Sequence, residues 1–366
     1  MARMIFHAPY PLDPQAKSAS GIRPVRMRQA FVKLGYQVFD LTGTPAQRKR
    51  RLRALRTLIR QGVEFDFCYS ESATIPNAVA GKKHFPPHPL LDADVFATCK
   101  RAGIPAGVFY RDIYWAFPDY VERVGWPLAT AMRGLYLADL VAYRCFLKKV
   151  FLPSLHMGEH IPVVPAERFE ALPPGGETVD LGGAEYDGER NLELLYIGGL
   201  GGHYQLGKAV RAVEGLHGVR LTICTSSQCW NKARKDIGNL PDNVRVVHES
   251  GAGLIGLYKV ADVCMLFVEP HEYWDFAVPV KLFEYVGHGK PVICSQGIFP
   301  ESFVRSEGVG WVIGYEVDQL RSLIKQLISD PNLVAAVRNH VRSKRELFTW
   351  EARANQAAQA LAECRV

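Results

Sequence analysis

Lys281 and Glu284 stand one helical turn apart in residues 279–293, a segment whose pattern predicts a helix, a tight turn and a buried strand. Pro279 suits the first turn of a helix, and Gly287 favours its end. The free N–H groups and the dipole at such a helix start attract anions, and Lys281 adds a cation there. Glu284 can accept two hydrogen bonds from the hydroxyls of a ribose. The segment predicts a nucleotide site, and an ordinary helix with a solvated lysine and glutamate is the alternative.

Arg111, Asp112 and Tyr114 follow directly on a predicted buried strand at residues 106–110. In an open α/β sheet, ligands bind outside the carboxyl ends of the strands. Asp112 can act there as a general base or as an anchor for a sugar hydroxyl, with Arg111 as its charge partner or as a phosphate contact. A purely structural pair of Arg111 with Asp112 is the alternative.

A glycine-rich turn after the predicted strand at residues 194–197 contains Gly198, Gly199 and Gly201. Such a turn lets backbone N–H groups approach a phosphate closely. Glycines also occur as ordinary loop residues, so the turn is weak evidence by itself. Another loop of small residues, 17–21, follows the first predicted strand but lacks the full GxGxxG pattern of a dinucleotide site.

The elements that must position these residues alternate between strand and helix along the whole chain. This alternation predicts an α/β fold of Rossmann-like, doubly wound domains. A chain of 366 residues is too long for one typical core, which indicates two domains. The Pro- and Gly-rich segment 162–176 is expected to link them, and a last helix is expected after residues 348–350.

The composition is that of a soluble globular protein, with 48% hydrophobic and 22% charged residues. No apolar run approaches the roughly 20 residues of a membrane span, and the N-terminus lacks a secretory signal. The eight cysteines are scattered without a CxxC pair. We therefore expect a reduced, cytoplasmic protein with neither a disulfide framework nor a zinc site.

Positive charge is concentrated in the first part of the chain. Residues 1–150 hold 23 Lys and Arg against 11 Asp and Glu, whereas residues 151–366 hold 21 against 26. A predicted amphipathic helix at 46–61 carries much of this charge, and its basic residues include Arg48, Lys49, Arg50, Arg51 and Arg53. An anionic membrane surface, a solvated helix face and nucleic acid are the three interpretations. No nucleic-acid-binding motif accompanies the helix, so nucleic acid is discounted.

The arrangement resembles the GT-B glycosyltransferases, and within them family-4-like enzymes of the group 1 type. The resemblance covers nearly the whole chain. Its most specific parts are residues 279–293, 196–200, 172–175 and 258–263, together with the turn at 348–351. Some members of the family act on lipid-linked acceptors at the inner face of a bacterial membrane.

The resemblance implies two Rossmann-like domains that face each other across a cleft. Residues 1–172 would bind the acceptor, residues 173–347 would bind the nucleotide-sugar, and residues 348–366 would form a helix that crosses back to the first domain. It also implies that the reaction takes place in the cleft. Neither a metal nor a cofactor is expected, since the nucleotide-sugar is a substrate and no DxD motif is present.

Single residues on the donor side follow from the same resemblance. Glu284 matches the glutamate that binds the donor ribose. Many retaining members have a second glutamate eight positions earlier, where this chain has Phe276 with Asp275 beside it. The usual Arg and Lys of the first loop of the second domain are also missing. The diphosphate would then be neutralised by Lys281, by Lys208 or by an arginine of the first domain.

On the acceptor side, Gly21 matches the glycine loop that approaches the donor. Asp112 falls near the strand end where related enzymes keep a catalytic His or Asp. Asp112 is thus the expected catalytic residue, and Arg111, Tyr114 and Asp275 are expected sugar or acceptor contacts. The expected donor-binding residues are Gly21, Gly198, Gly199, Gly201, Lys281 and Glu284.

The implied function is glycosyl transfer, of the hexosyltransferase type, from a UDP- or GDP-type nucleoside diphosphate sugar. The acceptor would be a glycan or a lipid-linked intermediate of cell-surface polysaccharide or glycolipid synthesis. The protein would work in the cytoplasm, as a peripheral protein on the inner face of an anionic membrane. A nucleotide-sugar epimerase of the same fold and a non-catalytic, membrane-associated subunit are the rival interpretations.

Overall fold

The computed structural model describes residues 2–16, 18–81, 88–182, 185–201 and 204–365. Lys17 of the first small-residue loop lies outside the described residues. The chain forms two compact units, and each is described by itself. Unit 1 comprises Met1–Pro174 together with Trp350–Val366, and unit 2 comprises Gly175–Thr349.

Unit 1 is built on a parallel sheet whose order is β2-β1-β3-β4-β5-β6 among the described residues. Its strands are β1 (Arg3–His7), β2 (Gln37–Leu41), β3 (Phe67–Glu71), β4 (Ala106–Phe109), β5 (Lys149–Leu152) and β6 (Phe169–Ala171). Its longer helices are α1 (Ala19–Lys33), α2 (Pro45–Arg60), α3 (Leu91–Arg101), α4 (Pro118–Val124), α5 (Trp126–Phe146) and α13 (Trp350–Ala362). Its short helical turns are η1 (Asn77–Val79), η2 (Tyr114–Ala116), η3 (His156–His160) and η4 (Ala166–Arg168).

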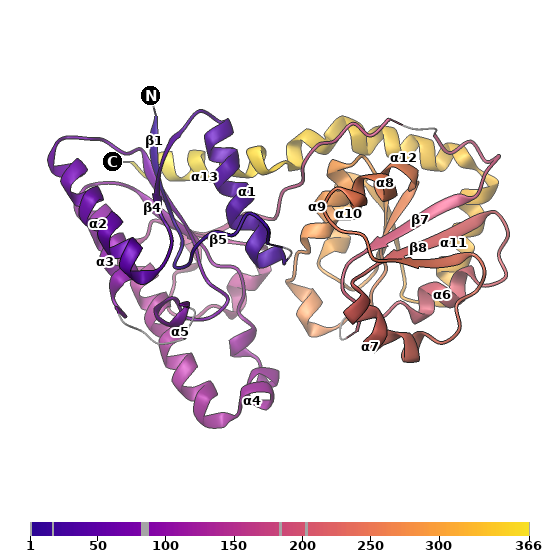
Figure 1. The fold of residues 1–366 in the computed structure, drawn as a ribbon, viewed down its shortest axis with the longest axis horizontal. Helices are drawn as coiled ribbons and strands as arrows, with labels where there is room; N and C mark the ends of the chain where they lie inside the picture. Colours follow the sequence, from indigo (N-terminus) through magenta and orange to yellow (C-terminus); the bar gives the residue numbers. More distant parts are fainter. Residues whose placement is uncertain (1, 17, 82–87, 183–184, 202–203, 366) are drawn as a thin grey trace. The chain divides into compact units, whose positions relative to one another are not determined.

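Helices cover both faces of this sheet (Figure 1). α1 packs against α13 on one face, whereas α3 packs between α2 and α5 on the other. The strands are apolar on both faces, as in Met4–Phe6 of β1, which is fully buried. The return of the last helix to the N-terminal domain is thereby confirmed.

The segment 162–176, expected to be an interdomain linker, is in part a strand, and that expectation is wrong for its middle. β6 pairs with β5 in parallel, with Phe151 opposite Glu170. The prolines of the segment lie outside the paired residues, where the N–H that proline lacks is not required by the ladder. β6 therefore extends the sheet at its edge.

Unit 2 repeats the architecture with the strand order β12-β11-β10-β7-β8-β9 among the described residues. Its strands are β7 (Leu192–Ile197), β8 (Val219–Cys224), β9 (Val244–Val247), β10 (Val263–Leu266), β11 (Val292–Ser295) and β12 (Gly310–Ile313). Its helices are α6 (Gly207–Val213), α7 (Ser227–Ile237), α8 (Gly253–Val260), α9 (Val280–Gly287), α10 (Pro300–Glu307), α11 (Val317–Ser329) and α12 (Pro331–Lys344), with the short turns η5 (Glu272–Asp275) and η6 (Arg345–Phe348).

Successive strand residues of unit 2 point into two separate cores. Met265 packs with α6 and α11 on one side of the sheet, whereas Leu266 packs with α8 and α9 on the other. This burial on both faces explains why the strands read as continuous apolar runs in the sequence. The α/β fold with two Rossmann-like domains, predicted from the sequence, is confirmed.

Candidate active site

The strand order of each sheet marks where a ligand can bind. In open α/β sheets, ligands bind outside the carboxyl ends of the strands, at the point where the strand order reverses. This point lies between β1 and β3 in unit 1 and between β7 and β10 in unit 2. Polar side chains gather at both points.

In unit 2, the amine of Lys281 lies among aromatic side chains at the end of β7. Nζ donates a hydrogen bond of 3.1 Å to the Tyr196 hydroxyl and lies 3.8 Å from the centre of the Tyr204 ring. No carboxylate of the described residues lies within ion-pair distance of this amine. Tyr196, Gly198, Gly199, Tyr204 and Lys281 are called the lysine cluster below.

The environment of Lys281 holds its pKa at about 7, far below the usual range of a lysine. The main cause is burial, which disfavours the charged amine, and the carboxylate of Glu284 acts in the opposite direction. The first turn of α9 has no acidic residue that would offset a cation. A buried amine of this kind gains its charge most readily when an anion arrives beside it.

Gly198 and Gly199 belong to the turn that lies beside the Lys281 amine. Gly198 has φ +150, and a Cβ added there would lie 2.7 Å from Nζ of Lys281. The Tyr196 hydroxyl donates a hydrogen bond of 2.6 Å to the Gly199 carbonyl, which fixes the turn relative to the lysine. The turn predicted to bind phosphate and the helix predicted to bind phosphate therefore meet at one point.

A Gly198→Ala substitution is expected to weaken binding of UDP at least tenfold, by roughly 1.4 kcal/mol or more. The added methyl group would press on the Lys281 amine and would place an L-residue in a conformation that favours glycine. Gly256→Ala on α8 is the matched control, because its Cβ would also meet no atom within 4 Å and it lies outside the lysine cluster. Calorimetric titration of both variants decides, and equal losses in the two would contradict this role of Gly198.

The pKa of Lys281 also predicts how donor binding depends on pH. Below pH 7 the amine is protonated before the donor binds, so its contribution to affinity is complete. Above a pKa of about 7, binding must also take up a proton, and the affinity for UDP-glucose should fall about tenfold per pH unit. A titration series between neutral and alkaline pH measures this slope. Lys281→Met should remove it, and a slope that persists in the variant would assign the titration to another group.

The other residues predicted to contact the donor lie on α9 or elsewhere in unit 2. Glu284 lies one turn after Lys281 and is close enough to influence its charge. Asp275 is exposed at the end of η5, whereas Phe276 is buried. Lys208 already forms an ion pair of 3.2 Å with Glu316. Lys208 is therefore a weaker candidate than Lys281 for neutralising a diphosphate.

A cavity of about 290 Å³ adjoins the lysine cluster in unit 2. Gly201, Tyr204, Lys208 and Tyr315 are among its lining residues. Because the Tyr204 ring covers the Lys281 amine and also lines the cavity, the two features are contiguous. Gly201, which has φ +92, belongs to the cavity wall and has no contact with the amine in the structure.

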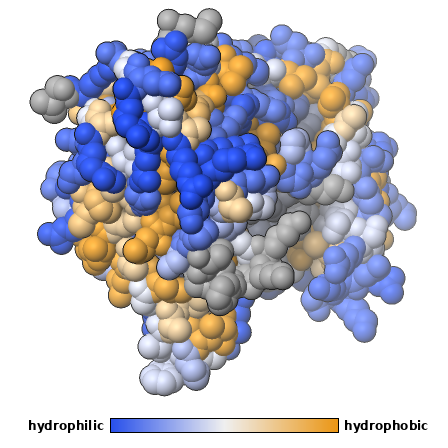
Figure 2. Space-filling model, turned by 60° about the vertical axis from the view of Figure 1, so that its left-hand side comes forward, coloured by the Kyte–Doolittle hydropathy of each residue, from blue (hydrophilic) through white to orange (hydrophobic). Residues whose placement is uncertain are grey.

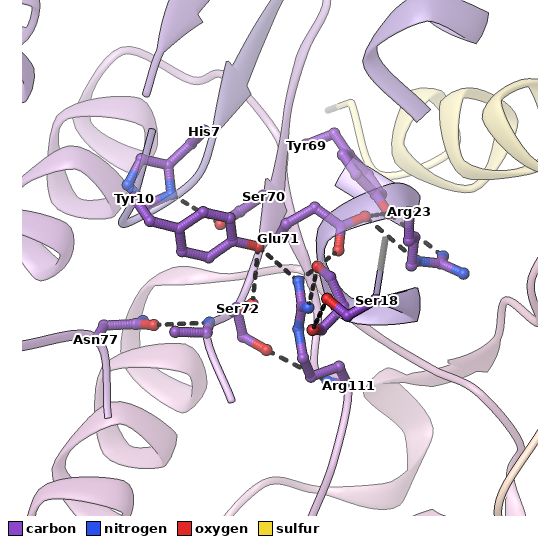
Figure 3. Close-up of polar contacts among 12 residues, drawn as sticks. His7, Tyr10, Ser18, Arg23, Tyr69, Ser70, Glu71, Ser72, Asn77 and Arg111 are labelled. Carbon is purple, nitrogen blue, oxygen red and sulfur yellow. Dashed lines mark hydrogen bonds and ion pairs between the residues drawn. The ribbon is translucent and has the colours of Figure 1, made fainter. Parts of the chain in front are cut away.

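In unit 1, a fully buried carboxylate occupies the end of β3. Glu71 accepts hydrogen bonds from Arg23 (3.2 Å), from Arg111 (3.2 Å) and from the Tyr69 hydroxyl (2.8 Å). Figure 3 shows these side chains converging on Glu71 from α1, from β3 and from the loop after β4. We call Glu71, Arg23, Arg111, Tyr69 and Tyr10 the glutamate cluster. Its two guanidinium groups exceed its one carboxylate by one positive charge.

Arg111 connects this cluster to the first turn of α1. Its guanidinium donates to the Ser20 carbonyl at 2.6 Å and to the Tyr10 hydroxyl. Burial raises the pKa of Tyr10 to about 12, so this hydroxyl keeps its proton at neutral pH. Gly21 lies next to Ser20, and a Cβ there would meet the Ala16 side chain at 2.5 Å. The predicted residues Gly21 and Arg111 are thus brought close together.

Asp112 and Arg111 do not form the structural pair that the sequence left open as an alternative. Arg111 pairs with Glu71, whereas the Asp112 carboxylate accepts the backbone N–H of Tyr114 at 3.0 Å. Burial raises the pKa of Asp112, with hydrogen bonds from Tyr114 and Ile113 opposing the shift. A carboxylate made more basic in this way is suited to accept a proton.

Tyr114, an expected sugar or acceptor contact, packs within unit 1. Its hydroxyl lies 3.3 Å from the Tyr136 hydroxyl, and its ring meets the Tyr120 ring edge to face. Trp115 stacks on Tyr136 in the same group of aromatic side chains. Tyr114 remains half-buried, so part of its ring is exposed beside Asp112.

Behind the glutamate cluster, Ser70, His7 and Asp92 form a buried hydrogen-bonded row. His7 lies 2.8 Å from Ser70 Oγ through Nδ1 and 2.9 Å from Asp92 through Nε2. A Ser–His–Asp row invites comparison with a hydrolase triad. All three side chains are buried, and burial lowers the pKa of His7, so the row holds β1, β3 and α3 together without access for a substrate.

Arg48 completes this row, which corrects one prediction. The Arg48 side chain is only 3% exposed and forms an ion pair with Asp92, so it does not face a membrane. The helix itself was predicted correctly, and Arg48 lies on its buried side with Leu52 and Leu55. Arg51 is half-buried and donates to the Thr42 carbonyl at 2.7 Å. Lys49, Arg50 and Arg53 are exposed.

Sequence reasoning missed Glu71, Arg23 and Tyr196. A signal existed for Glu71, because this glutamate is the last residue of β3 and the other residues of the strand carry no charge. A buried carboxylate requires partners of opposite charge, and the arginines of residues 23 and 111 were available. Among the described residues, no group of three His, Cys, Asp or Glu side chains is placed to hold a metal ion.

No family model matches the sequence, and no curated protein matches it. Solved structures match over the whole chain. Sucrose-phosphate synthase from Thermosynechococcus elongatus is 14% identical with a TM-score of 0.62, and the match covers 100% of this chain and 99% of that one. HepE from Anabaena, in complex with UDP-glucose, is 13% identical with a TM-score of 0.62, covering 99% and 100%.

A third similar structure is WaaG, a glycosyltransferase involved in lipopolysaccharide biosynthesis. It is 16% identical with a TM-score of 0.56, and the match covers 99% of both chains. At these identities the likeness concerns the fold. The chain has the two-domain fold of the GT-B glycosyltransferases.

Proposed function

We propose that the protein is a glycosyltransferase that uses a UDP- or GDP-type nucleoside diphosphate sugar. The observation that carries this proposal is Lys281, a half-buried amine without a carboxylate partner among the described residues, at the strand-order reversal of unit 2. A Cβ added at Gly198 would lie 2.7 Å from this amine, so the glycine turn passes directly beside it. The complex of HepE with UDP-glucose, a protein of the same fold, supports a donor of this class.

Lys281 and the backbone around it would stabilise the leaving group. As the bond between the sugar and the diphosphate breaks, negative charge grows on the phosphate oxygens. A fixed cation, the N–H group of Gly199 and the start of α9 can offset that charge without reorganising, whereas the Gly201 N–H donates to the Tyr204 carbonyl at 3.0 Å. Glu284 would accept hydrogen bonds from the ribose hydroxyls, and these groups need no metal to act.

Unit 1 would handle the acceptor. The acceptor oxygen forms the new bond to the sugar carbon as the bond to the diphosphate breaks, and its proton passes to a base. Asp112 would take this proton if the reaction inverts the anomeric centre, or would orient the sugar if it retains. The raised pKa of Asp112 favours the first role. Arg111, Tyr114 and Asp275 remain proposed contacts of the sugar or the acceptor.

The proposed acceptor is a glycan or a lipid-linked intermediate of cell-surface polysaccharide or glycolipid synthesis, at the cytoplasmic face of an anionic membrane. WaaG, of the same fold, is involved in lipopolysaccharide biosynthesis. The exposed cations Lys49, Arg50 and Arg53 of α2 support attraction to anionic lipid. No helix in the described part of the chain is long and apolar enough to cross a bilayer.

Transfer of a radiolabelled sugar tests the proposal. The protein is incubated with labelled UDP- or GDP-sugars and a bacterial lipid and glycan extract, and label in the acceptor fraction is counted. Asp112→Asn and Glu284→Ala should each lower transfer by about 10² or more, because each removes a group that acts on the reacting molecules. Near-normal transfer in both variants would refute these assignments.

The rivals predict other outcomes of the same assay. An epimerase of the same fold would convert the free nucleotide-sugar with no acceptor present. A non-catalytic subunit would neither convert the donor nor bind it. Calorimetry without acceptor identifies the non-catalytic subunit, since a glycosyltransferase must bind the nucleoside diphosphate by itself and such a subunit would not.

A further inference from the structure

The outer face of α5 is an exposed helix surface without charge. Over more than four turns, the exposed positions on this face include Trp126, Thr130, Ala131, Gly134, Leu137, Ala138 and Val141. Trp126 is 72% exposed, Val141 48% and Leu137 38%. Tyr136 and Leu140, on the opposite side, are buried in the unit. The seven exposed positions are called the outer face of α5 below.

Two of the three charged residues within α5 are held away from this face, and the third, Arg144, is exposed in the last turn of the helix. The Arg133 guanidinium donates to the Trp115 carbonyl at 3.0 Å, and the Asp139 carboxylate accepts the Asn77 backbone N–H at 2.8 Å. Both bonds pull the side chains toward the body of unit 1. A helix face in contact with water normally carries charged residues, as α2 does, so an uncharged face of this length indicates a binding surface.

Cations border the C-terminal part of the outer face. On α3, Lys100 donates to the Cys145 carbonyl at 2.8 Å, which places its amine beside the end of α5. Arg144, in the last turn of α5, is exposed and donates to the Val163 carbonyl. Beyond α3 lies the basic face of α2. The exposed acidic residues of α4, Asp119 and Glu122, precede the opposite end of α5.

Figure 2 shows the same division on this side of the molecule. Hydrophobic side chains gather on its lower left part, and strongly hydrophilic side chains lie above them. α2, α3 and α5 share one face of the unit 1 sheet, with α3 packed between α2 and α5. The combination of an apolar face with a cationic border matches the layering of an anionic bilayer, whose charged headgroups lie outside its acyl chains.

We propose that the outer face of α5 rests in the interfacial layer of an anionic membrane, with Leu137 and Val141 in contact with acyl chains and Lys100 and Arg144 at the headgroups. The helix would lie on the membrane, since no described helix is able to span it. This inference names the membrane surface of the proposed enzyme and does not require glycosyl transfer. Lipid binding is measured without donor, so failure of one proposal can be distinguished from failure of the other.

Flotation with vesicles of phosphatidylcholine and phosphatidylglycerol tests the proposal, using the full chain. The double variant Leu137→Asp/Val141→Asp places two carboxylates on the outer face and should bind roughly tenfold more weakly or worse. Leu347→Asp is the matched control, because Leu347 is 62% exposed on unit 2 and should leave vesicle binding unchanged. Circular dichroism and thermal melting verify that both variants are folded.

The salt dependence of vesicle binding distinguishes binding through the outer face of α5 from binding through the basic residues of α2. Attraction by Lys49, Arg50 and Arg53 is screened as salt rises, whereas burial of apolar side chains is not. The vesicle binding that remains at high salt should therefore survive Arg50→Glu/Arg53→Glu and vanish in the α5 variant. Unchanged binding in the folded α5 variant would overturn the proposal. So would a dimer in solution that the same variant converts to monomers, because a second copy would then cover the face.

Discussion

A Lys281→Met variant is expected to bind UDP roughly hundredfold more weakly than the wild type and to transfer sugar about 10² to 10³ times more slowly. Lys281 supplies the cation that lies against Gly198, 2.7 Å from the place of an added Cβ, and the turn itself carries no basic side chain. Its loss removes about 2.7 kcal/mol or more from the interaction with a diphosphate. Titration calorimetry and steady-state kinetics measure the two effects.

The variant should stay folded, and this separates binding from stability. Burial holds the pKa of Lys281 at about 7, so the native state disfavours the charged amine that the unfolded chain carries at neutral pH. A methionine of similar length removes that cost, and the free energy of unfolding should equal or exceed that of the wild type. A variant that both unfolds and loses nucleotide would fail to support the assignment.

Lys290→Met is the matched control for this prediction. Lys290 is also a buried lysine with a lowered pKa, of about 8, but its amine donates to the Ala261 carbonyl at 2.6 Å. Ala261 precedes β10, so this lysine lies at the end of the sheet opposite Gly198. Lys290→Met should keep the nucleotide affinity of the wild type. A similar loss in both lysine variants would show that nucleotide binding does not depend on the position of Lys281.

Replacing Glu71 with glutamine is expected to destabilise unit 1 by about 3–5 kcal/mol. The substitution leaves the guanidinium groups of Arg23 and Arg111 buried with no carboxylate between them. The amide can accept only part of their hydrogen bonds and provides no counter-charge. Urea denaturation followed by circular dichroism measures the change in the free energy of unfolding.

Glu170→Gln is the control for Glu71. Glu170 forms an ion pair of 3.1 Å with Lys149, and both side chains are about a quarter exposed. Partly solvated pairs of this kind contribute about 1 kcal/mol or less. If Glu71→Gln lowered the free energy of unfolding no more than Glu170→Gln does, the glutamate cluster would not stabilise unit 1 in the way we expect.

Some of the site could be predicted from local sequence alone. A glycine turn after one strand and a helix start after another must both lie at the carboxyl edge of a parallel sheet, so chain order placed Gly198 and Lys281 on the same edge. That they meet there depends on β7 lying beside β10. The position of Asp112 after β4 followed in the same way. These predictions needed only the direction of each strand.

The partner of Arg111 could not be predicted in this way. Its neighbour in sequence, Asp112, was the obvious candidate, yet its carboxylate partner is Glu71, 40 residues earlier. That pairing depends on β3 lying beside β4, with Glu71 opposite Phe109 in the ladder. Strand adjacency is a property of the whole sheet, and no local pattern reports it.

Arg48 was wrongly predicted to face a membrane, although a local signal for its burial was present. Residues 48, 52 and 55 have the spacing of one helical face, and positions 52 and 55 are leucines. The periodicity thus placed Arg48 on the buried side. What it did not reveal was Asp92 of α3, the partner that makes burial of the arginine possible.

A crystal structure of the protein with bound UDP would test the central claim most directly. We expect the diphosphate to lie between the Gly198–Gly199 turn and α9, with Nζ of Lys281 within hydrogen-bond distance of a phosphate oxygen and Glu284 on the ribose. A diphosphate bound elsewhere, for example beside Lys208 in the adjoining cavity with the Lys281 amine still on Tyr196, would contradict it.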